Sequence, residues 1–386
     1  MAGAAPIRVA LALNYFDADR GGSETWATHF AAWLSKRNYE VSIVATEGRP
    51  SPDVRLHTAS APLHPWRRAR ILTALAASLK VDLIHDTGVL LAADVFHPHM
   101  GSRFLNLKRE IAARPLAERL RLAVSPGLAR WLLQTRRLEK RQLRSARKII
   151  AASRLVASDL RRTKACKADR MDIIHHGIRN AAFENASGDT ARLAARRGFG
   201  LRDEILFVVS AHNFLLKGVG AVIDALAVLT PEERARIKVY VAGNGDIARY
   251  RKYAVRCGVE GCIYFMGSVA DMAGLYRAAD VALHPTFHDA CSLSTLEAIA
   301  SGIPVITTAF NGAADFIDHE KDGIVLPSPD KRLLAAAMRR MLPAEERQRF
   351  KEALKGKAHL VSQDINFERI EAVYRQVLFE RQGQVC

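Results

Sequence analysis

Residues 280–307 read DVALHPTFHDACSLSTLEAIASGIPVIT, and they decide the fold because they spell a strand, a loop, a helix and a second strand in succession. The apolar run 281–283 ends before Pro285, and Ser292 is a residue type that caps the start of a helix. Leucine and isoleucine then recur at helical spacing as far as Gly302, which can end a helix in a left-handed conformation. A strand–helix–strand unit of this kind predicts an α/β fold with a parallel sheet.

Two acidic side chains flank the predicted start of this helix. Asp289 lies in the preceding loop, and Glu297 lies about one and a half turns inside the helix. In an open α/β sheet, ligands bind beyond the carboxyl ends of the strands, and a helix N-terminus there suits a phosphate group. Because carboxylates accept hydrogen bonds from sugar hydroxyls, the pattern indicates a site for a nucleotide sugar. The alternative is an ordinary turn aspartate and a solvated helix glutamate.

The segment from Glu297 to Val305, EAIASGIPV, carries a family motif. It resembles the second half of the donor-site signature of retaining GT-B glycosyltransferases of family 4, which is Glu-x7-Glu followed by Ala-x-Ala-x-Gly-x-Pro-Val. The first half differs, since Asp289 stands at the first Glu and Ser292 at the usual Gly. The resemblance covers nearly the whole chain. It implies an α/β fold of the GT-B type, with two Rossmann-like domains facing across a cleft.

Further motifs resemble the lipopolysaccharide core glucosyltransferases of this family. They are Lys217-Gly218, Ala278-Ala279-Asp280 and His284-Pro285. The resemblance implies a donor, UDP-glucose or a close relative, and a retaining reaction by front-face attack that needs neither a metal nor a cofactor. It also implies a lipid-linked or lipopolysaccharide-core saccharide as the acceptor.

The resemblance assigns roles to individual donor-site residues. Glu297 would hold the ribose hydroxyls, and Asp289 the sugar hydroxyls. Lys217 would neutralise the leaving diphosphate, together with the backbone N–H groups of Ser292 and Leu293. His212 stands where the family has an arginine, and a histidine is mostly neutral at pH 7, so we assign most of the phosphate contact to Lys217. The full donor-binding set comprises Gly21, Gly22, His212, Lys217, Gly267, Asp289, Ser292, Leu293 and Glu297.

The first part of the chain opens with a strand at 7–13, the glycine pair Gly21-Gly22, a helix and a strand at 41–45. Glycines beyond a first strand let a phosphate approach the backbone, although a tight turn explains them equally. In the family, a histidine of this domain lies beside the transferred sugar. His99 is the better candidate and His97 the lesser, and a structural role for either stays open. The sequence shows no third ligand near this pair, which argues against a metal site.

Residues 103–148 form a basic segment with a helical pattern, broken near Pro115 and again at 125–127. It contains fourteen Lys or Arg and three Glu, a net charge of +11 out of the chain's +17. A basic amphipathic helix with an aromatic residue is typical of a membrane-surface element that binds anionic lipid. A core-facing apolar stripe with a solvated basic face is the alternative, and the lack of interleaved aromatics argues against nucleic acid. The candidate membrane-binding residues are Arg130, Trp131, Arg136, Arg137, Lys140 and Arg141.

Length and composition set the domain organisation. The chain has 386 residues, 49% hydrophobic and 25% charged, which suits two globular domains. We expect an acceptor-side domain at 1–180, a linker at 181–203, a nucleotide-sugar donor domain at 204–363 and a final helix at 364–386 that crosses back to the first domain. The five cysteines lack metal-site spacing, and we expect a cytoplasmic protein on the inner face of the cytoplasmic membrane.

The sequence therefore predicts a hexosyltransferase. Two alternatives from other classes stay open. One is a nucleotide-sugar epimerase or a phosphorylase on the same scaffold. The other is a non-catalytic protein that binds membrane or nucleic acid and whose donor site has decayed, as the substitutions at 212, 289 and 292 allow.

Overall fold

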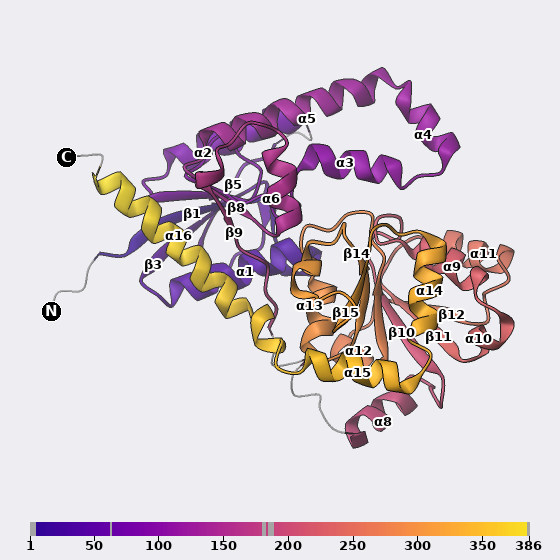
Figure 1. Ribbon diagram of the computed structural model, residues 1–386. Helices are drawn as coiled ribbons and strands as arrows, with labels where there is room; N and C mark the ends of the chain where they lie inside the picture. The colour runs from indigo at the N-terminus through magenta and orange to yellow at the C-terminus, as the bar shows by residue number, and fades with distance from the viewer. Residues whose placement is uncertain (1–4, 62–63, 180–182, 184–188, 384–386) are drawn as a thin grey trace. The chain divides into compact units, whose positions relative to one another are not determined.

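The computed structural model of the chain describes residues 5–61, 64–179, 183 and 189–383 (Figure 1). Within these ranges the chain forms two compact units. Unit 1 comprises Met1–Lys108, Leu120–Ile174 and Asn366–Cys386, and unit 2 comprises Arg109–Arg119 and His175–Ile365. The expected first domain ended at 180, whereas 109–119 and 175–180 cluster with unit 2. Residues 181–182 and 184–188 of the expected linker lie outside the described residues, and Asp189–Gly198 form a helix.

Unit 1 is built on a seven-stranded parallel sheet in the order β5-β3-β1-β6-β7-β8-β9. The central strand β1 is buried from Val9 to Ala12 because it is covered on both faces, as a continuous apolar run predicts. A short parallel pair, β2 and β4, lies beside the sheet. The strands are β1 (Ile7–Ala12), β2 (Tyr15–Phe16), β3 (Tyr39–Ala45), β4 (Glu47–Gly48), β5 (Arg55–Thr58), β6 (Leu83–Asp86), β7 (Val95–Phe96), β8 (Lys148–Ala151) and β9 (Met171–Ile173).

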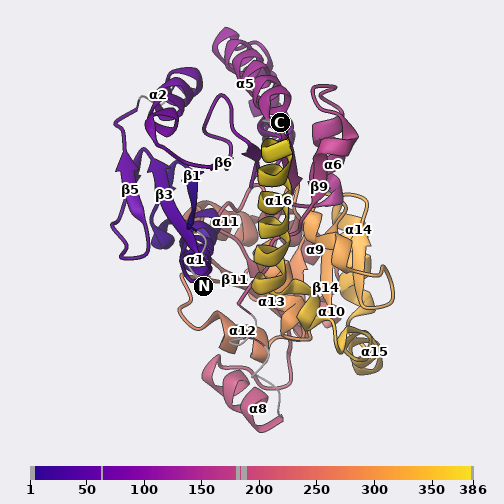
Figure 2. The same ribbon diagram turned by 90° about the vertical axis from the view of Figure 1, so that its left-hand side faces the viewer.

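The last helix of the chain packs on unit 1. Phe367, Ile370 and Tyr374 share one apolar cluster with Trp26 and Phe30, and Figure 2 shows this helix, α16, running along the unit in yellow. The basic segment forms three helices, with breaks beside Pro115 and Pro126 as the sequence predicts. The helices that belong wholly or partly to unit 1 are α1 (Gly22–Ser35), α2 (Pro65–Ser78), α3 (Arg103–Ala112), α4 (Leu116–Ala123), α5 (Pro126–Ser145), α6 (Arg154–Arg161) and α16 (Gln363–Gly383).

Unit 2 is a six-stranded parallel sheet in the order β12-β11-β10-β13-β14-β15. The first strand of the unit, β10, therefore lies between the second strand and the fourth. This is the strand order of a doubly wound dinucleotide-binding fold. The strands are β10 (Ile205–Ser210), β11 (Ile237–Ala242), β12 (Ile263–Gly267), β13 (Val281–His284), β14 (Val305–Thr308) and β15 (Gly323–Leu326).

Helices cover both faces of the second sheet (Figure 1), and β10 is buried from Ile205 to Val209. The carboxylate of Asp280, which precedes β13, accepts hydrogen bonds from Arg192 (2.7 Å) and Arg196 (3.0 Å) and so ties α8 to the sheet. The helices are α8 (Asp189–Gly198), α9 (Val219–Val228), α10 (Pro231–Ala235), α11 (Ile247–Arg256), α12 (Met272–Ala278), α13 (Leu293–Ala300), α14 (Lys331–Arg340) and α15 (Ala344–Leu354). In the described part of the chain, we find no helix with the length and apolarity needed to cross a lipid bilayer.

Candidate functional site

The candidate donor site lies in unit 2, at the point where the strand order reverses. Strands β10 and β13 are neighbours in the sheet. In a doubly wound sheet, the helices that follow two such strands lie on opposite faces, so the loops beyond the carboxyl ends of the strands diverge and leave room for a ligand. The loop after β10 carries Lys217. The loop after β13 carries Asp289 and leads into α13. The topology therefore brings together three features that the sequence separates by up to 80 positions.

Hydrogen bonds join these two loops. The carbonyl of Leu216 accepts from the N–H of Phe287 and from the hydroxyl of Thr286, both at 2.8 Å. Gly218 adopts a left-handed conformation with φ 73°, and a Cβ atom there would lie 2.0 Å from the carbonyl oxygen of Pro285. Only glycine fits between the loops at this point. The Lys217-Gly218 pair therefore fixes where the lysine side chain leaves the backbone.

Lys217 and Asp289 form an ion pair at the centre of the site. The same Asp289 carboxylate oxygen lies 3.1 Å from Nε2 of His284, the last residue of β13. Burial alone would raise the pKa of Asp289, but the Lys217 ammonium and His284 outweigh it and hold this pKa well below its ordinary value. Burial lowers the pKa of His284, and the nearby Lys217 lowers it further, although Asp289 opposes this. Asp289 is therefore a carboxylate at neutral pH.

Helix α13 begins where the sequence predicts. Ser292 is its N-cap, and the serine hydroxyl accepts from the N–H of Thr295 at 3.3 Å. Gly302, just beyond the helix, has φ 67°. The N–H of Ser292 already donates to Oδ1 of Asn311 at 3.3 Å, which differs from the expectation that it is available to a phosphate. The N–H of Leu293 has no hydrogen-bond partner among the described residues, so a phosphate can bind there.

Glu297 lies half-buried on α13 next to Tyr276 of α12. The fully buried tyrosine hydroxyl donates to the carbonyl of Ser294 at 3.1 Å. Burial raises the pKa of Glu297 to about 7, and a hydrogen bond with Tyr276 opposes the rise. Tyr276 therefore packs next to the glutamate, and the carboxyl of Glu297 is able to meet the two hydroxyl groups of a ribose.

Two further predicted donor residues lie at the same edge of the sheet. His212 is exposed in the loop after β10, and in the described residues no bond joins it to Lys217 or Asp289. Gly267 ends β12, and its carbonyl accepts from the N–H of Gly243 at 2.7 Å. This bond links the turns that follow β11 and β12. Gly267 therefore lies at the carboxyl end of β12, the outermost strand on this side of the sheet.

Both halves of the chain match sequence profiles of one enzyme class. The profile described as "Glycosyltransferase Family 4" matches residues 20–181, and the one described as "Glycosyl transferases group 1" matches residues 202–343. Between them they span most of the chain. This chain belongs to the family 4 glycosyltransferases with the GT-B fold.

Two curated relatives of this glycosyltransferase are bacterial enzymes. The lipopolysaccharide glucosyltransferase WaaG of Escherichia coli (strain K12) is 29% identical over 173 residues, 45% of this chain and 46% of that protein, so the match spans about half the relative's length. The D-inositol 3-phosphate glycosyltransferase of Saccharomonospora viridis is 24% identical over 357 residues, 84% of this chain and 81% of that protein.

Solved structures share the fold of this glycosyltransferase. The crystal structure of WaaG superposes with a TM-score of 0.79 at 21% identity, covering 95% of this chain and 99% of that one. The structure of the Anabaena protein HepE in complex with UDP and glucose gives a TM-score of 0.70 at 17% identity, covering 95% and 99%. These likenesses establish the GT-B fold.

In unit 1 of the glycosyltransferase, the glycine pair and the two histidines occupy different surroundings. Gly21 is the N-cap of α1 with extended backbone (φ 165°), and Gly22 begins the helix, so neither needs a left-handed conformation. His97 and His99 are both buried, and the ring of His99 packs edge-on against Trp26 with the centroids 4.2 Å apart. Trp26 therefore fixes the orientation of the His99 ring.

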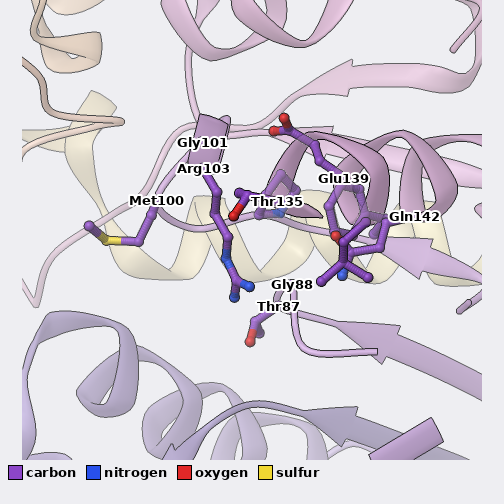
Figure 3. Close-up of a pocket in the computed structure, with 11 residues that line it drawn as sticks. Thr87, Gly88, Met100, Gly101, Arg103, Thr135, Glu139 and Gln142 are labelled. Atoms are coloured by element: carbon purple, nitrogen blue, oxygen red, sulfur yellow. The ribbon is translucent and has the colours of Figure 1, made fainter. Parts of the chain in front are cut away.

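A small cavity lies at the carboxyl ends of β6 and β7, beside α5 (Figure 3). Its volume of about 40 Å³ has room for a few water molecules and is too small for a sugar ring. Burial raises the pKa of Glu139, which lines the cavity, to about 7, and a hydrogen bond from Ser102 opposes the rise. We therefore assign no substrate to this cavity.

The six predicted membrane-binding residues all lie on α5, but in different environments. Trp131 and Arg130 are exposed near the start of the helix, and Lys140 is half-buried. The guanidinium of Arg136 lies 5.5 Å from the centroid of the Phe104 ring. Arg137 and Arg141 line an open hollow beside α2. Apart from the half-buried Lys140, the side chains of this set are exposed.

The sequence reasoning missed three residues that hold the donor site together: Tyr276, His284 as a partner of Asp289, and Asn311. The buried amide of Asn311 donates to the hydroxyls of Thr295 (2.9 Å) and Thr307 (3.0 Å). The dipeptide Asn311-Gly312, a common turn sequence, is a local signal at this position. In the described residues, no three His, Cys, Asp or Glu side chains are grouped so that they could hold a metal ion.

Proposed function

We propose that this glycosyltransferase moves a hexose from a nucleotide-diphosphate sugar, UDP-glucose or a close relative, to a hydroxyl of a saccharide acceptor. The observation that carries the proposal is the Lys217–Asp289 ion pair at the switch point of unit 2, next to the first N–H groups of α13. A cation and a helix N-terminus stabilise a diphosphate, and a carboxylate beside them accepts hydrogen bonds from the hydroxyls of an attached sugar.

Each group has a defined task in this proposal. The Lys217 ammonium and the Leu293 N–H hold the diphosphate, Glu297 accepts hydrogen bonds from the ribose hydroxyls, and Asp289 accepts them from the hexose. Because Lys217 already contacts Asp289, the incoming diphosphate shares the ammonium with this carboxylate. The lysine then links the sugar-binding group to the leaving group.

The reaction breaks the bond between the anomeric carbon and the phosphate oxygen of the donor. The oxygen of the acceptor hydroxyl forms the new bond to that carbon on the same face, so the configuration is retained. The hydroxyl proton passes to the released phosphate. The negative charge that develops on the diphosphate is stabilised by Lys217 and the helix N-terminus, so the proposal needs no metal. For His99 we propose a place near the transferred sugar.

The proposed acceptor is a lipid-linked or lipopolysaccharide-core saccharide at the inner face of the cytoplasmic membrane. An exposed apolar row on and after α4 supports a contact with lipid. Leu116, Leu120 and Val124 are 66%, 62% and 79% exposed and recur every fourth residue, with Arg119 and Arg121 beside them. Helical spacing puts the three on one face, and apolar groups next to arginines are typical of a helix lying on an anionic membrane.

The donor assignment is tested by measuring nucleotide release from a panel of nucleotide sugars, with and without a lipid-linked saccharide acceptor. We expect UDP-glucose or a near relative to be turned over, and Asp289→Asn to reduce this release by at least about 100-fold. The same variant should bind UDP at least as tightly as the wild type, since it removes the carboxylate that competes for Lys217.

Tight UDP binding without release from any donor would indicate a non-catalytic protein. Isomerisation of the sugar on the nucleotide would indicate an epimerase.

A further inference from the structure

The hollow between α2 and α5 of unit 1 has the chemistry of an anion site that the donor reaction does not use. It has a volume of about 440 Å³ and lies outside the small cavity of Figure 3. Its lining comes from two helices and the loop before β7. The lining residues are Trp66, Ala92, Arg137, Arg141, Arg144 and Ser145.

The three arginines of the hollow form a row of uncompensated charge. Arg137, Arg141 and Arg144 follow one another at four and three residues, which puts them on one face of α5 over about 10 Å of helix. No hydrogen bond or ion pair joins their guanidinium groups to another residue that the structure describes. Like charges at this spacing repel one another. An anion bound between the guanidinium groups would reduce this repulsion and accept their hydrogen bonds.

The hollow is also lined by an aromatic side chain, Trp66 of α2, whose indole ring is fixed in place. The indole N–H of Trp66 donates to the backbone carbonyl of Gln134 on α5 at 3.1 Å, so its polar atom is occupied and its orientation is set. A half-buried indole offers a flat apolar surface to a partner. Sugar rings present C–H groups that pack against an aromatic face of this kind.

We propose that this hollow binds a phosphorylated saccharide, with the phosphate on the arginines and the sugar ring against Trp66. A lipid headgroup carries the same phosphate, but the lining offers only Ala92 and Trp66 as apolar side chains. An exposed apolar row, Leu116, Leu120 and Val124, lies on and after α4, while the exposed Leu133 and Trp131 lie on the first half of α5 and do not line the hollow. The proposal that the hollow binds a sugar phosphate is independent of the proposed function. The further step, that this sugar phosphate is part of the acceptor, rests on the proposed function.

The test is a fluorine NMR titration of protein labelled with 5-fluorotryptophan. The chain has four tryptophans, and the Trp66 resonance is the one that Trp66→Phe removes, so the other three report on the rest of the protein. UDP is present at saturation to fill the donor site. Glucose 6-phosphate, inorganic phosphate and glucose are the probes, and vesicles of phosphatidylglycerol and phosphatidylcholine form a separate arm.

We expect glucose 6-phosphate to shift the Trp66 resonance at lower concentration than inorganic phosphate or glucose does. Arg137→Gln with Arg141→Gln should weaken this binding by at least about tenfold, because two charged hydrogen-bond donors are lost. The matched control, Arg161→Gln with Arg162→Gln, removes the same charge from the exposed end of α6 and should leave it unchanged. Lys217→Ala, which removes the proposed diphosphate contact, should also leave it unchanged, so failure of the donor assignment and of this proposal remain distinguishable.

Three results would overturn the proposal. They are an unshifted Trp66 resonance with glucose 6-phosphate, an equal response in the Arg137/Arg141 variant, and a response to the vesicles alone.

Discussion

Glu297 titrates near neutral pH, which makes its contribution to folding measurable. Its pKa is about 4.5 when exposed to water and about 7 in the folded protein, because burial disfavours the charged form. The folded protein keeps the proton to higher pH than the unfolded chain does. Stability should therefore fall as the pH rises from about 4.5 to about 7, with no further loss from this group above that range.

The predicted test is thermal unfolding of Glu297→Gln. A pKa raised from about 4.5 to about 7 corresponds to about 3 kcal/mol. Glutamine is neutral throughout, so the melting temperature of the variant relative to the wild type should rise across this pH window by roughly 5–10 °C, because about 1 kcal/mol corresponds to about 2–4 °C in domains of this size. Glu260→Gln, which changes an exposed side chain of the same unit, is the control. A difference between variant and wild type that is the same at pH 5 and pH 8 would contradict this prediction.

At the scale of elements, the helices of the basic segment show how far a local pattern predicts structure. The prolines mark the breaks correctly, because proline cannot continue a helix from its amino side. The apolar stripe of α5 was expected either to face lipid or to face the core, and the structure shows that one part of it is buried and another part is exposed. Leu138 is buried, while Trp131 near the start of the helix is 42% exposed. The second half of α5 packs in unit 1 and the first half does not. This difference depends on tertiary packing and cannot be predicted from the local sequence pattern.

The exposed row on α4 gives the element-scale prediction. Leu120→Asp should reduce binding to vesicles of phosphatidylglycerol and phosphatidylethanolamine by about tenfold, since insertion of a leucine side chain contributes about 1.5 kcal/mol or more. The control is Leu193→Asp on α8, because Leu193 is 57% exposed and Leu120 is 62% exposed. Sedimentation with vesicles at several salt concentrations measures both. Equal loss in the two variants, or no loss in either, would reject α4 as a membrane contact.

At the scale of the whole molecule, the sheets were predictable and the contacts within the site were not. Continuous apolar runs such as 205–209 predict buried parallel strands, and a capping serine predicts the start of α13, because these signals are local. The Lys217–Asp289 ion pair, the role of Tyr276 beside Glu297 and the use of the Ser292 N–H by Asn311 depend on strand order. Strand order brings distant residues together, and no spacing along the chain encodes it.

The central claim is that the edge of unit 2 around Lys217 holds the diphosphate of the donor. Calorimetric titration with UDP and with UMP tests it most directly, comparing wild type, Lys217→Ala and, as a control, the exposed Lys252→Ala. We predict that Lys217→Ala weakens UDP binding by at least about tenfold, while its effect on UMP is much smaller and Lys252→Ala changes neither. Unchanged affinity of Lys217→Ala for UDP would contradict the account.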